Sequence, residues 1–361
     1  MRQEGMRRAV GCMTGTSLDG IDVALVEVEG VGLSMRARFV RGVSHGLGEV
    51  GMRLRHLAEQ HPMRAHEIAA MMYEFAGLHV SAIRALLGGE GCDLVSVHGQ
   101  TVFHKPPLSW QVMQPARVAR EIGAKVVFDL RQADLAAGGQ GAPITPIADA
   151  ILFRDVPGPW GVVNLGGFCN VTLAPGGDVR PEAIMAKDVC ACNQLLDSVA
   201  RTVLYRAYDE GGEAALRGRV HEDAFADLEG ILASQGGAGR SLGTGDEPGA
   251  WVSRWRAHMT PDDLCATACA GIAEAAALAT ADASVLLLAG GGTRNQALVE
   301  AMGSSSSARV GMTDEAGVPA MYREAACFAV LGALCEDRVP ITLPQVTGCA
   351  SPAPVSGVWV M

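Results

Sequence analysis

The sequence has few charged and few aromatic side chains, which make up 19% and 5% of its 361 residues. Basic residues are also scarcer than acidic ones, 29 against 39, so the formal net charge is −10. A protein that binds the phosphate backbone of nucleic acids needs a basic surface, and this balance argues against that class. With 49% hydrophobic residues the chain is also not a disordered one.

Long apolar runs are missing as well. No stretch approaches the ~18 apolar residues that a membrane-spanning helix requires. The basic start, Met1–Arg8, is followed by a short apolar stretch that Thr14 and Thr16 interrupt, so we expect no secretory signal. The ten cysteines include no Cys-x-x-Cys pair. We therefore expect a cytoplasmic protein with reduced, buried cysteines and no membrane or nucleic-acid partner.

Glycine, in contrast, is abundant, with 45 residues. An acidic protein that binds a polyphosphate must do so locally, with backbone N–H groups in glycine turns or at helix N-termini. The first such turn is Gly15–Asp22, whose residues are Gly15, Thr16, Ser17, Leu18, Asp19, Gly20, Ile21 and Asp22. Its backbone and hydroxyl groups suit phosphate oxygens, and Asp19 and Asp22 suit Mg²⁺ through water. An ordinary hairpin with Asp-Gly in its turn is an equal alternative.

Two further glycine turns follow apolar strands. The second turn contains Asn164, Gly166 and Gly167. Placed across a cleft from the first loop, this turn would hold the other end of a triphosphate. Gly290, Gly291 and Gly292, with Asn295, form the third. Three consecutive glycines do not fit the G-x-G-x-x-G dinucleotide pattern, so a plain strand-to-helix turn is favoured on this segment alone.

Strands alternate with helical segments along the chain, which predicts an α/β fold, and an early hairpin predicts mixed sheets. Thr260 followed by Pro261 predicts a helix that runs to about Ala279. A strand, glycine turn and strand occur twice, which suggests a duplicated core. We place the boundary and a hinge near Gly138–Gly141, giving domains of residues 1–137 and 138–361.

Polar residues at strand ends are further candidates for a substrate site. His98 and Gln100 follow an apolar strand, where side chains point towards a crevice, although a lone histidine is more often structural. Arg131 suits a carboxylate in a bidentate pair, with an ion pair to Asp134 as an equal alternative. Asp188 suits a general base, but its spacing alone favours a helix N-cap.

Together these segments resemble the anhydro-N-acetylmuramic acid kinase family over essentially the whole chain. The matching motifs are Gly15–Asp22, His98–Thr101, Asp134–Pro143, Asn164–Gly167 with Asn170, Gly290–Gly292 with Asn295, and Glu324-Ala325 with Phe328-Ala329. Asp188 and Asn193 match the ends of the family's Asp-Thr-Gly-Pro-x-Asn motif, but Val189–Cys192 replaces its centre. Met113 and Gln114 stand where the family usually has Gly and Asp.

The resemblance implies a two-lobed, duplicated actin-like ATPase (ribonuclease H-like) fold with mixed sheets flanked by helices. It implies ATP, with Mg²⁺, bound by the three glycine turns, and Asp188 as catalytic base. It implies that His98, Gln100, Arg131 and Asn193 bind the sugar, and that the protein is a homodimer. The implied reaction, in peptidoglycan recycling, opens the 1,6-anhydro ring with water and phosphorylates O6, giving N-acetylmuramate 6-phosphate and ADP.

The two departures from the family motifs leave two alternatives open. One is an ATP-dependent kinase of another amino sugar, in which Asp188 deprotonates a hydroxyl group instead of water. The other is a nucleotide-binding relative whose catalysis is impaired by the change at Val189–Cys192.

Overall fold

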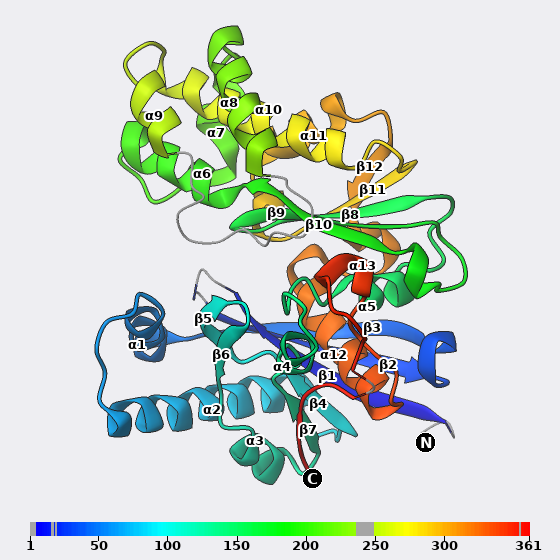
Figure 1. Cartoon of the computed structure of the whole chain (residues 1–361). Helices are drawn as coiled ribbons and strands as arrows, with labels where there is room; N and C mark the ends of the chain where they lie inside the picture. Colours follow the sequence, from blue (N-terminus) through cyan, green and yellow to red (C-terminus); the bar gives the residue numbers. More distant parts are fainter. Residues whose placement is uncertain (1–4, 16–17, 19, 236–248, 354) are drawn as a thin grey trace. The chain divides into compact units, whose positions relative to one another are not determined.

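The computed structural model describes residues 5–15, 18, 20–235, 249–353 and 355–361. The chain forms two compact units (Figure 1). The first unit comprises Met1–Arg154, Asp178–Glu182 and Tyr322–Met361, and the second comprises Asp155–Gly177 and Ala183–Met321.

This division differs from the expected domains of residues 1–137 and 138–361. The chain leaves the first unit after Arg154, and Gly138–Gly141 lies inside that unit and away from its ends. Residues 322–361 return to the first unit because the helix α12 (Arg323–Glu336) packs on its sheet.

The first unit is built on a six-stranded mixed sheet. Its strands are β1 (Met6–Thr14), β2 (Gly20–Glu29), β3 (Arg36–Gly46), β4 (Leu94–Val97), β7 (Lys125–Phe128) and β13 (Val358–Val360). Their order is β13-β7-β4-β1-β2-β3, in which β1, β2 and β3 run antiparallel and β4 and β7 run parallel to β1. The early hairpin expected from the sequence is therefore confirmed.

The other elements of this unit are helices and one separate hairpin. Its helices are α1 (Gly48–Ala58), α2 (Ala65–Leu87), α3 (Pro115–Ile122), α4 (Gln132–Ala136), α5 (Pro146–Leu152), α12 and α13 (Pro344–Thr347). A separate hairpin consists of β5 (Gln100–Lys105) and β6 (Leu108–Val112).

The two faces of this sheet carry different helices. Val10 and Cys12 share an apolar core with Phe75 of α2. Side chains alternate along a strand, so Gly11 faces the opposite side, where α12 lies. A Cβ atom on Gly11 would be 1.8 Å from the Ala325 carbonyl oxygen, so only glycine lets α12 approach β1 this closely.

The second unit repeats the strand topology of the first. Its strands are β8 (Trp160–Leu165), β9 (Phe168–Ala174), β10 (Met185–Ala191), β11 (Val285–Ala289) and β12 (Arg309–Met312), in the order β10-β9-β8-β11-β12. The first three strands are antiparallel, and the next two run parallel to the first, as in the first unit. This agreement confirms the duplicated α/β core and the mixed sheets.

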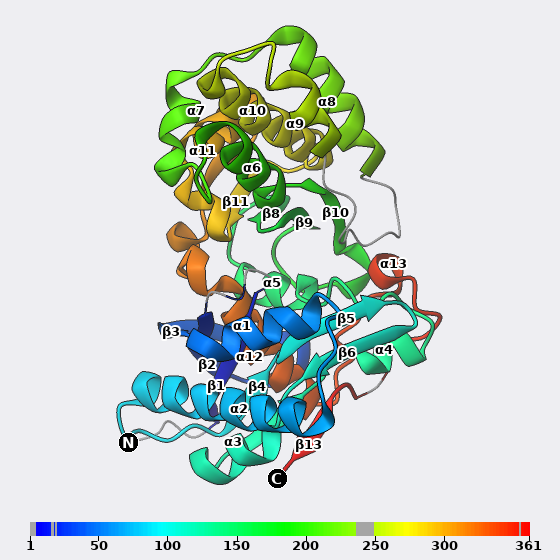
Figure 2. The ribbon, with the colours of Figure 1, turned by 90° about the vertical axis from the view of Figure 1, so that its left-hand side faces the viewer.

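Helices cover the sheet of the second unit (Figure 2). They are α6 (Asn193–Val199), α7 (Glu213–Arg217), α8 (Glu222–Gln235), α9 (Gly249–Trp255), α10 (Pro261–Ala279) and α11 (Gln296–Ser305). The predicted start of α10 is confirmed, because the Thr260 side chain accepts a hydrogen bond from the Asp263 N–H at 3.1 Å. Among the described residues, no helix is both long enough and apolar enough to cross a membrane.

Candidate functional site

The loop between β1 and β2 carries the first glycine turn. The Leu18 N–H donates to the Gly15 carbonyl at 3.2 Å, and Leu18 has a left-handed backbone with φ of 57°. Asp22 lies at the start of β2, where its Oδ1 accepts a hydrogen bond from the Ser44 hydroxyl at 2.5 Å. The candidates Thr16, Ser17 and Asp19 lie outside the described residues.

Three predicted sugar-side residues lie in the first unit, and two of them touch. An Arg131 Nη2 atom lies 3.1 Å from His98 Nε2, and Arg131 Nη1 donates to the Gly141 carbonyl at 2.7 Å. His98 Nδ1 lies 2.8 Å from the Gly99 carbonyl. Burial and the nearby Arg131 charge lower the pKa of His98 to about 3, so its ring is neutral.

The predicted hinge at Gly138–Gly141 is tied to its surroundings. Asp134 accepts hydrogen bonds from the Gly141 N–H and the Thr347 hydroxyl, both at 2.7 Å. A Cβ atom on Gly139 would lie 2.2 Å from Asp134 Oδ2, so this glycine allows the close approach. The Asp134 carboxylate therefore holds this loop through hydrogen bonds. The sequence had instead suggested an ion pair with Arg131 as one role for Asp134.

Two glutamines of the β5–β6 hairpin are buried. Gln100 and Gln111 are 2% and 3% exposed, and within the described part of the chain neither Oε1 has a hydrogen-bond partner. A buried acceptor left unpaired costs about 1–3 kcal/mol, so both atoms are suited to donors on a ligand. The sequence pointed to Gln100 as a sugar contact but not to Gln111. The signal that could have found Gln111 is its position as a polar residue at the end of β6.

Glu324 is a residue that the sequence placed in a family motif without a role. It lies in the first turn of α12 and is partly buried. Burial raises the pKa of its carboxyl group, while the nearby Arg323 and Arg131 charges lower it. The adjacent Arg323 donates to Asp149 Oδ1 at 2.7 Å and so fixes this end of α12.

In the second unit, three predicted segments meet. The Asn193 N–H donates to the Gly166 carbonyl at 3.0 Å, and its side-chain amide donates to the Leu165 carbonyl at 3.1 Å. A Cβ atom on Gly292 would lie 2.7 Å from Leu165 Cβ and 3.0 Å from Asn193 Oδ1. The turns at Asn164–Gly167 and Gly290–Gly292 and the start of α6 therefore form one cluster.

Glycines let the segments of this cluster pack closely against one another. Gly290 has φ of 85°, and a Cβ atom there would lie 2.8 Å from Asn164 Oδ1. That Asn164 oxygen is buried and has no hydrogen-bond partner among the described residues. Gly291, by contrast, is exposed, and a Cβ atom there would lie 3.8 Å from Asn193 Nδ2, so the backbone at this position is open to a ligand. Asn295 instead caps α11, since its Oδ1 accepts from the Leu298 N–H at 3.0 Å.

Asp188 lies inside β10, opposite Asn170, and not at a helix start. The N-cap interpretation is therefore wrong, since Cys192 occupies that position of α6 and makes no side-chain capping bond. The pairing register shifts between Asp188 and Cys190, which marks a β-bulge. Bulges redirect side chains and are frequent beside active sites.

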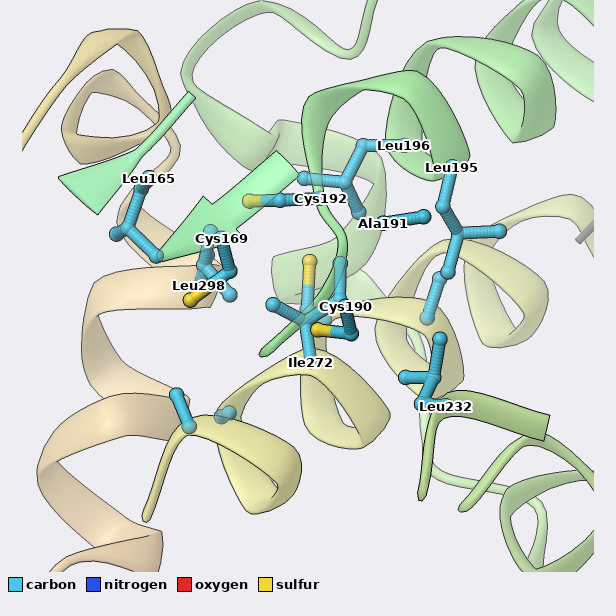
Figure 3. Packing of buried hydrophobic residues seen from close by; sticks show 14 of the residues in the cluster. Leu165, Cys169, Cys190, Ala191, Cys192, Leu195, Leu196, Leu232, Ile272 and Leu298 are labelled. Carbon is cyan, nitrogen blue, oxygen red and sulfur yellow. The ribbon is translucent and has the colours of Figure 1, made fainter. Parts of the chain in front are cut away.

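The departures from the family motifs, apart from Gln114, pack in apolar cores. Val189, Cys190 and Cys192 are each at most 5% exposed and join the core of the second unit (Figure 3). There Cys190 lies near Ile272 of α10. Met113, at 3% exposure, joins the core of the first unit. Gln114 is exposed.

A divalent cation has few candidate ligands here. The described residues include no group of three or more His, Cys, Asp or Glu that could hold a metal ion. Mg²⁺ usually keeps several waters and takes one or two carboxylates together with substrate phosphates. The Asp22 carboxylate fits this mode of binding, in which the nucleotide supplies the remaining oxygen ligands.

Comparisons with known proteins agree over nearly the whole chain. Anhydro-N-acetylmuramic acid kinase of Methylorubrum extorquens is 33% identical, covering 98% of each chain. The protein of that name from Bordetella pertussis is 35% identical over 95% of this chain and 93% of its own. Among solved structures, the activator of 2-hydroxyisocaproyl-CoA dehydratase from Clostridium difficile has a TM-score of 0.43 and 12% identity, covering 90% of this chain and 94% of its own. The family model for anhydro-N-acetylmuramic acid kinase matches residues 7–360, and the chain therefore belongs to that family.

Proposed function

We propose that this protein is a cytoplasmic, ATP-dependent kinase of anhydro-N-acetylmuramic acid in peptidoglycan recycling. The family membership supports this activity, because relatives that carry this name align over nearly their full length. The observation that carries the proposal is the cluster in the second unit, where two glycine turns meet the start of α6 beside Asp188. A homodimer is part of the proposal on the family resemblance alone.

Asp188 is the catalytic base of the proposed reaction. Its carboxylate takes a proton from a water molecule as the water oxygen attacks the anomeric carbon C1. The C1–O6 bond breaks, and O6 takes the γ-phosphoryl group of ATP. The products are N-acetylmuramate 6-phosphate and ADP. Because the leaving oxygen is itself the phosphoryl acceptor, no separate general acid is required, and catalysis depends mainly on positioning and electrostatics.

The glycine turns are the proposed nucleotide site. Backbone N–H groups there offer hydrogen bonds to phosphate oxygens without a basic surface, which suits a chain of net charge −10. Mg²⁺, when bound, neutralises triphosphate charge, and Asp22 together with Asp19 is proposed to hold it through water. The proposed nucleotide contacts are Gly15, Thr16, Ser17, Leu18, Gly20, Ile21, Asn164, Gly166, Gly167, Gly290, Gly291, Gly292 and, through its cap position, Asn295.

Residues of the first unit, together with Asn193 of the second, are proposed to bind the sugar. The planar Arg131 guanidinium fits the lactyl carboxylate in a bidentate pair. The unpartnered Oε1 atom of Gln100 accepts from a sugar hydroxyl or amide N–H. These contacts distinguish the muramic substrate from sugars that lack the lactyl group.

A coupled assay of ADP release tests the proposal. Wild-type protein should release ADP with the anhydro sugar and not with open N-acetylmuramate. Asp188→Asn should lower kcat by roughly 10²–10⁴, because a positioned base contributes about that factor. Asp282→Asn, which changes an exposed aspartate of the same unit, is the matched control and should keep wild-type turnover.

The outcomes separate the proposal from its alternatives. Equal or greater turnover of the open sugar would identify a kinase of another amino sugar. ATP binding without turnover of either sugar would identify a catalytically impaired relative. Wild-type turnover in Asp188→Asn, with ATP bound normally, would refute the proposed role of Asp188.

A further inference from the structure

The hydrogen bonds of His98 fix its tautomer. A carbonyl oxygen can only accept, so His98 Nδ1, 2.8 Å from the Gly99 oxygen, must carry the proton. A guanidinium can only donate, so we assign Nε2 as the bare nitrogen that accepts from Arg131 Nη2 at 3.1 Å. The Thr14 backbone also interacts with the ring. Both ring nitrogens are thus engaged within the protein.

The ring itself has little freedom to move. His98 is 6% exposed, and its backbone N–H donates to the Cys12 carbonyl at 3.0 Å. The ring contacts Phe328 of α12 edge-on, with centroids 5.1 Å apart. The acceptor nitrogen is therefore held at a fixed position between β4 and α12.

Arg131 receives two fixed, neutral acceptors from this arrangement. His98 Nε2 binds one terminal nitrogen, and the Gly141 carbonyl binds the other at 2.7 Å. The Gly141 position is itself set by Asp134, which accepts the Gly141 N–H. The two bonds orient the guanidinium plane, while the Asp129 and Glu324 carboxyl groups interact with its charge from nearby.

We propose that His98 is a positioning residue that orients Arg131 for an anionic group of the sugar, and does not contact the sugar itself. This inference rests on the proposed function, which assigns the lactyl carboxylate to Arg131. It replaces the direct sugar contact expected for His98 from the sequence. The guanidinium pairs with a carboxylate bidentately only when its plane is correctly set, so the loss of one orienting bond weakens that pair.

Two variants of His98 separate its acceptor from its shape. His98→Phe keeps an aromatic ring beside Phe328 but has no acceptor, whereas His98→Gln keeps a terminal oxygen that can accept from Arg131. For the anhydro-muramic substrate we expect His98→Phe to raise KM about 10- to 100-fold, the range of a hydrogen bond to a charged group. The kcat and the KM for ATP should change by less than threefold, and His98→Gln should recover most of the loss.

The anhydro form of N-acetylglucosamine, which lacks the lactyl carboxylate, is the matched substrate control. If His98 acts through Arg131, His98→Phe should have little effect on this sugar. It should also add little to Arg131→Met, because the two changes remove one interaction. His79→Phe, which replaces another fully buried histidine of the first unit, controls for packing and should leave the sugar KM unchanged.

Several results would overturn the inference. These are equal losses in His98→Phe and His98→Gln, equal effects on both sugars, or additive losses with Arg131→Met. Nitrogen-15 NMR of labelled histidine tests the tautomer without turnover, and a proton on Nε2 would also refute the inference. Failure of the wild-type protein to turn over the anhydro-muramic sugar would instead refute the proposed function, while the NMR result would still decide the His98–Arg131 bond.

Discussion

At the scale of single residues, two buried histidines of the first unit are held neutral by their surroundings. His79 is fully buried, its Nδ1 lies 2.9 Å from the Phe75 carbonyl, and burial lowers its pKa to about 4. Burial and the Arg131 charge lower the pKa of His98 further, to about 3. At mildly acidic pH the unfolded chain therefore binds protons on these rings, whereas the folded chain leaves them neutral.

The stability of the protein should accordingly fall on mild acidification. Below the ordinary histidine pKa of 6.5, the unfolded chain binds protons that the folded chain does not bind until about pH 4 for His79. The free energy of unfolding should fall by about 1.4 kcal/mol per pH unit for each histidine in this window. Urea unfolding at pH 7, 6, 5 and 4 measures how the free energy of unfolding changes with pH. His79→Phe should reduce this slope by about 1.4 kcal/mol per pH unit, which corresponds to one proton.

The test compares the pH dependence of the free energy of unfolding in His79→Phe and in the wild type. The absolute stability of the variant therefore does not affect the result. An unchanged slope in His79→Phe between pH 6 and pH 4 would contradict the assignment of a neutral, buried ring.

At the scale of elements, the sequence predicted those helices and strands whose signals are local. The apolar run of β4 and the Thr260 cap of α10 depend only on residues that are neighbours in the sequence, and the structure confirms both. The bulge after Asp188 was missed because its register depends on pairing with β9. The candidate site was predicted to a similar extent: motifs located its loops, but the contacts of His98 and the unpaired Gln111 oxygen need three-dimensional neighbours.

The contact between β1 and α12 gives a prediction at this scale. Gly11→Ala would place a Cβ atom 1.8 Å from the Ala325 carbonyl and 2.4 Å from the Ala329 nitrogen. Both are backbone atoms, so α12 would have to shift, at a cost of about 3 kcal/mol or more in the free energy of unfolding. Urea denaturation measures this loss.

A matched control is Gly230→Ala on α8, where an added Cβ atom meets nothing within 4 Å. Removing a helix glycine should there leave stability unchanged or raise it slightly, by up to about 1 kcal/mol. Equal stabilities of the two variants would contradict the close approach of α12 to β1.

At the scale of the whole molecule, the sequence revealed the repeat but not the division into units. Two similar strand–glycine–strand patterns suggested a duplicated core, and the shared strand order confirms it. The return of residues 322–361 to the first unit could not be predicted, because it depends on the packing of α12 against β1, whose residues lie at the opposite end of the sequence.

The proposed reaction gives a prediction at this scale. It requires Asp188 of the second unit and Arg131 of the first to act on one sugar, so we expect the units to close on their ligands. Small-angle scattering should show a smaller radius of gyration with a non-hydrolysable ATP analogue plus the anhydro sugar than without ligands. Glucose in place of the anhydro sugar is the control, and identical scattering in all three states would contradict closure.

The three-segment composition of the first unit also sets an order of assembly during synthesis. The second unit is complete once Met321 has left the ribosome, whereas β1 of the first unit must wait for α12. Until then, the face of β1 at Gly11 has no helix to cover it. We therefore expect the unit that begins the chain to be the last to finish folding, and a chain that stops before Tyr322 to leave one face of β1 uncovered.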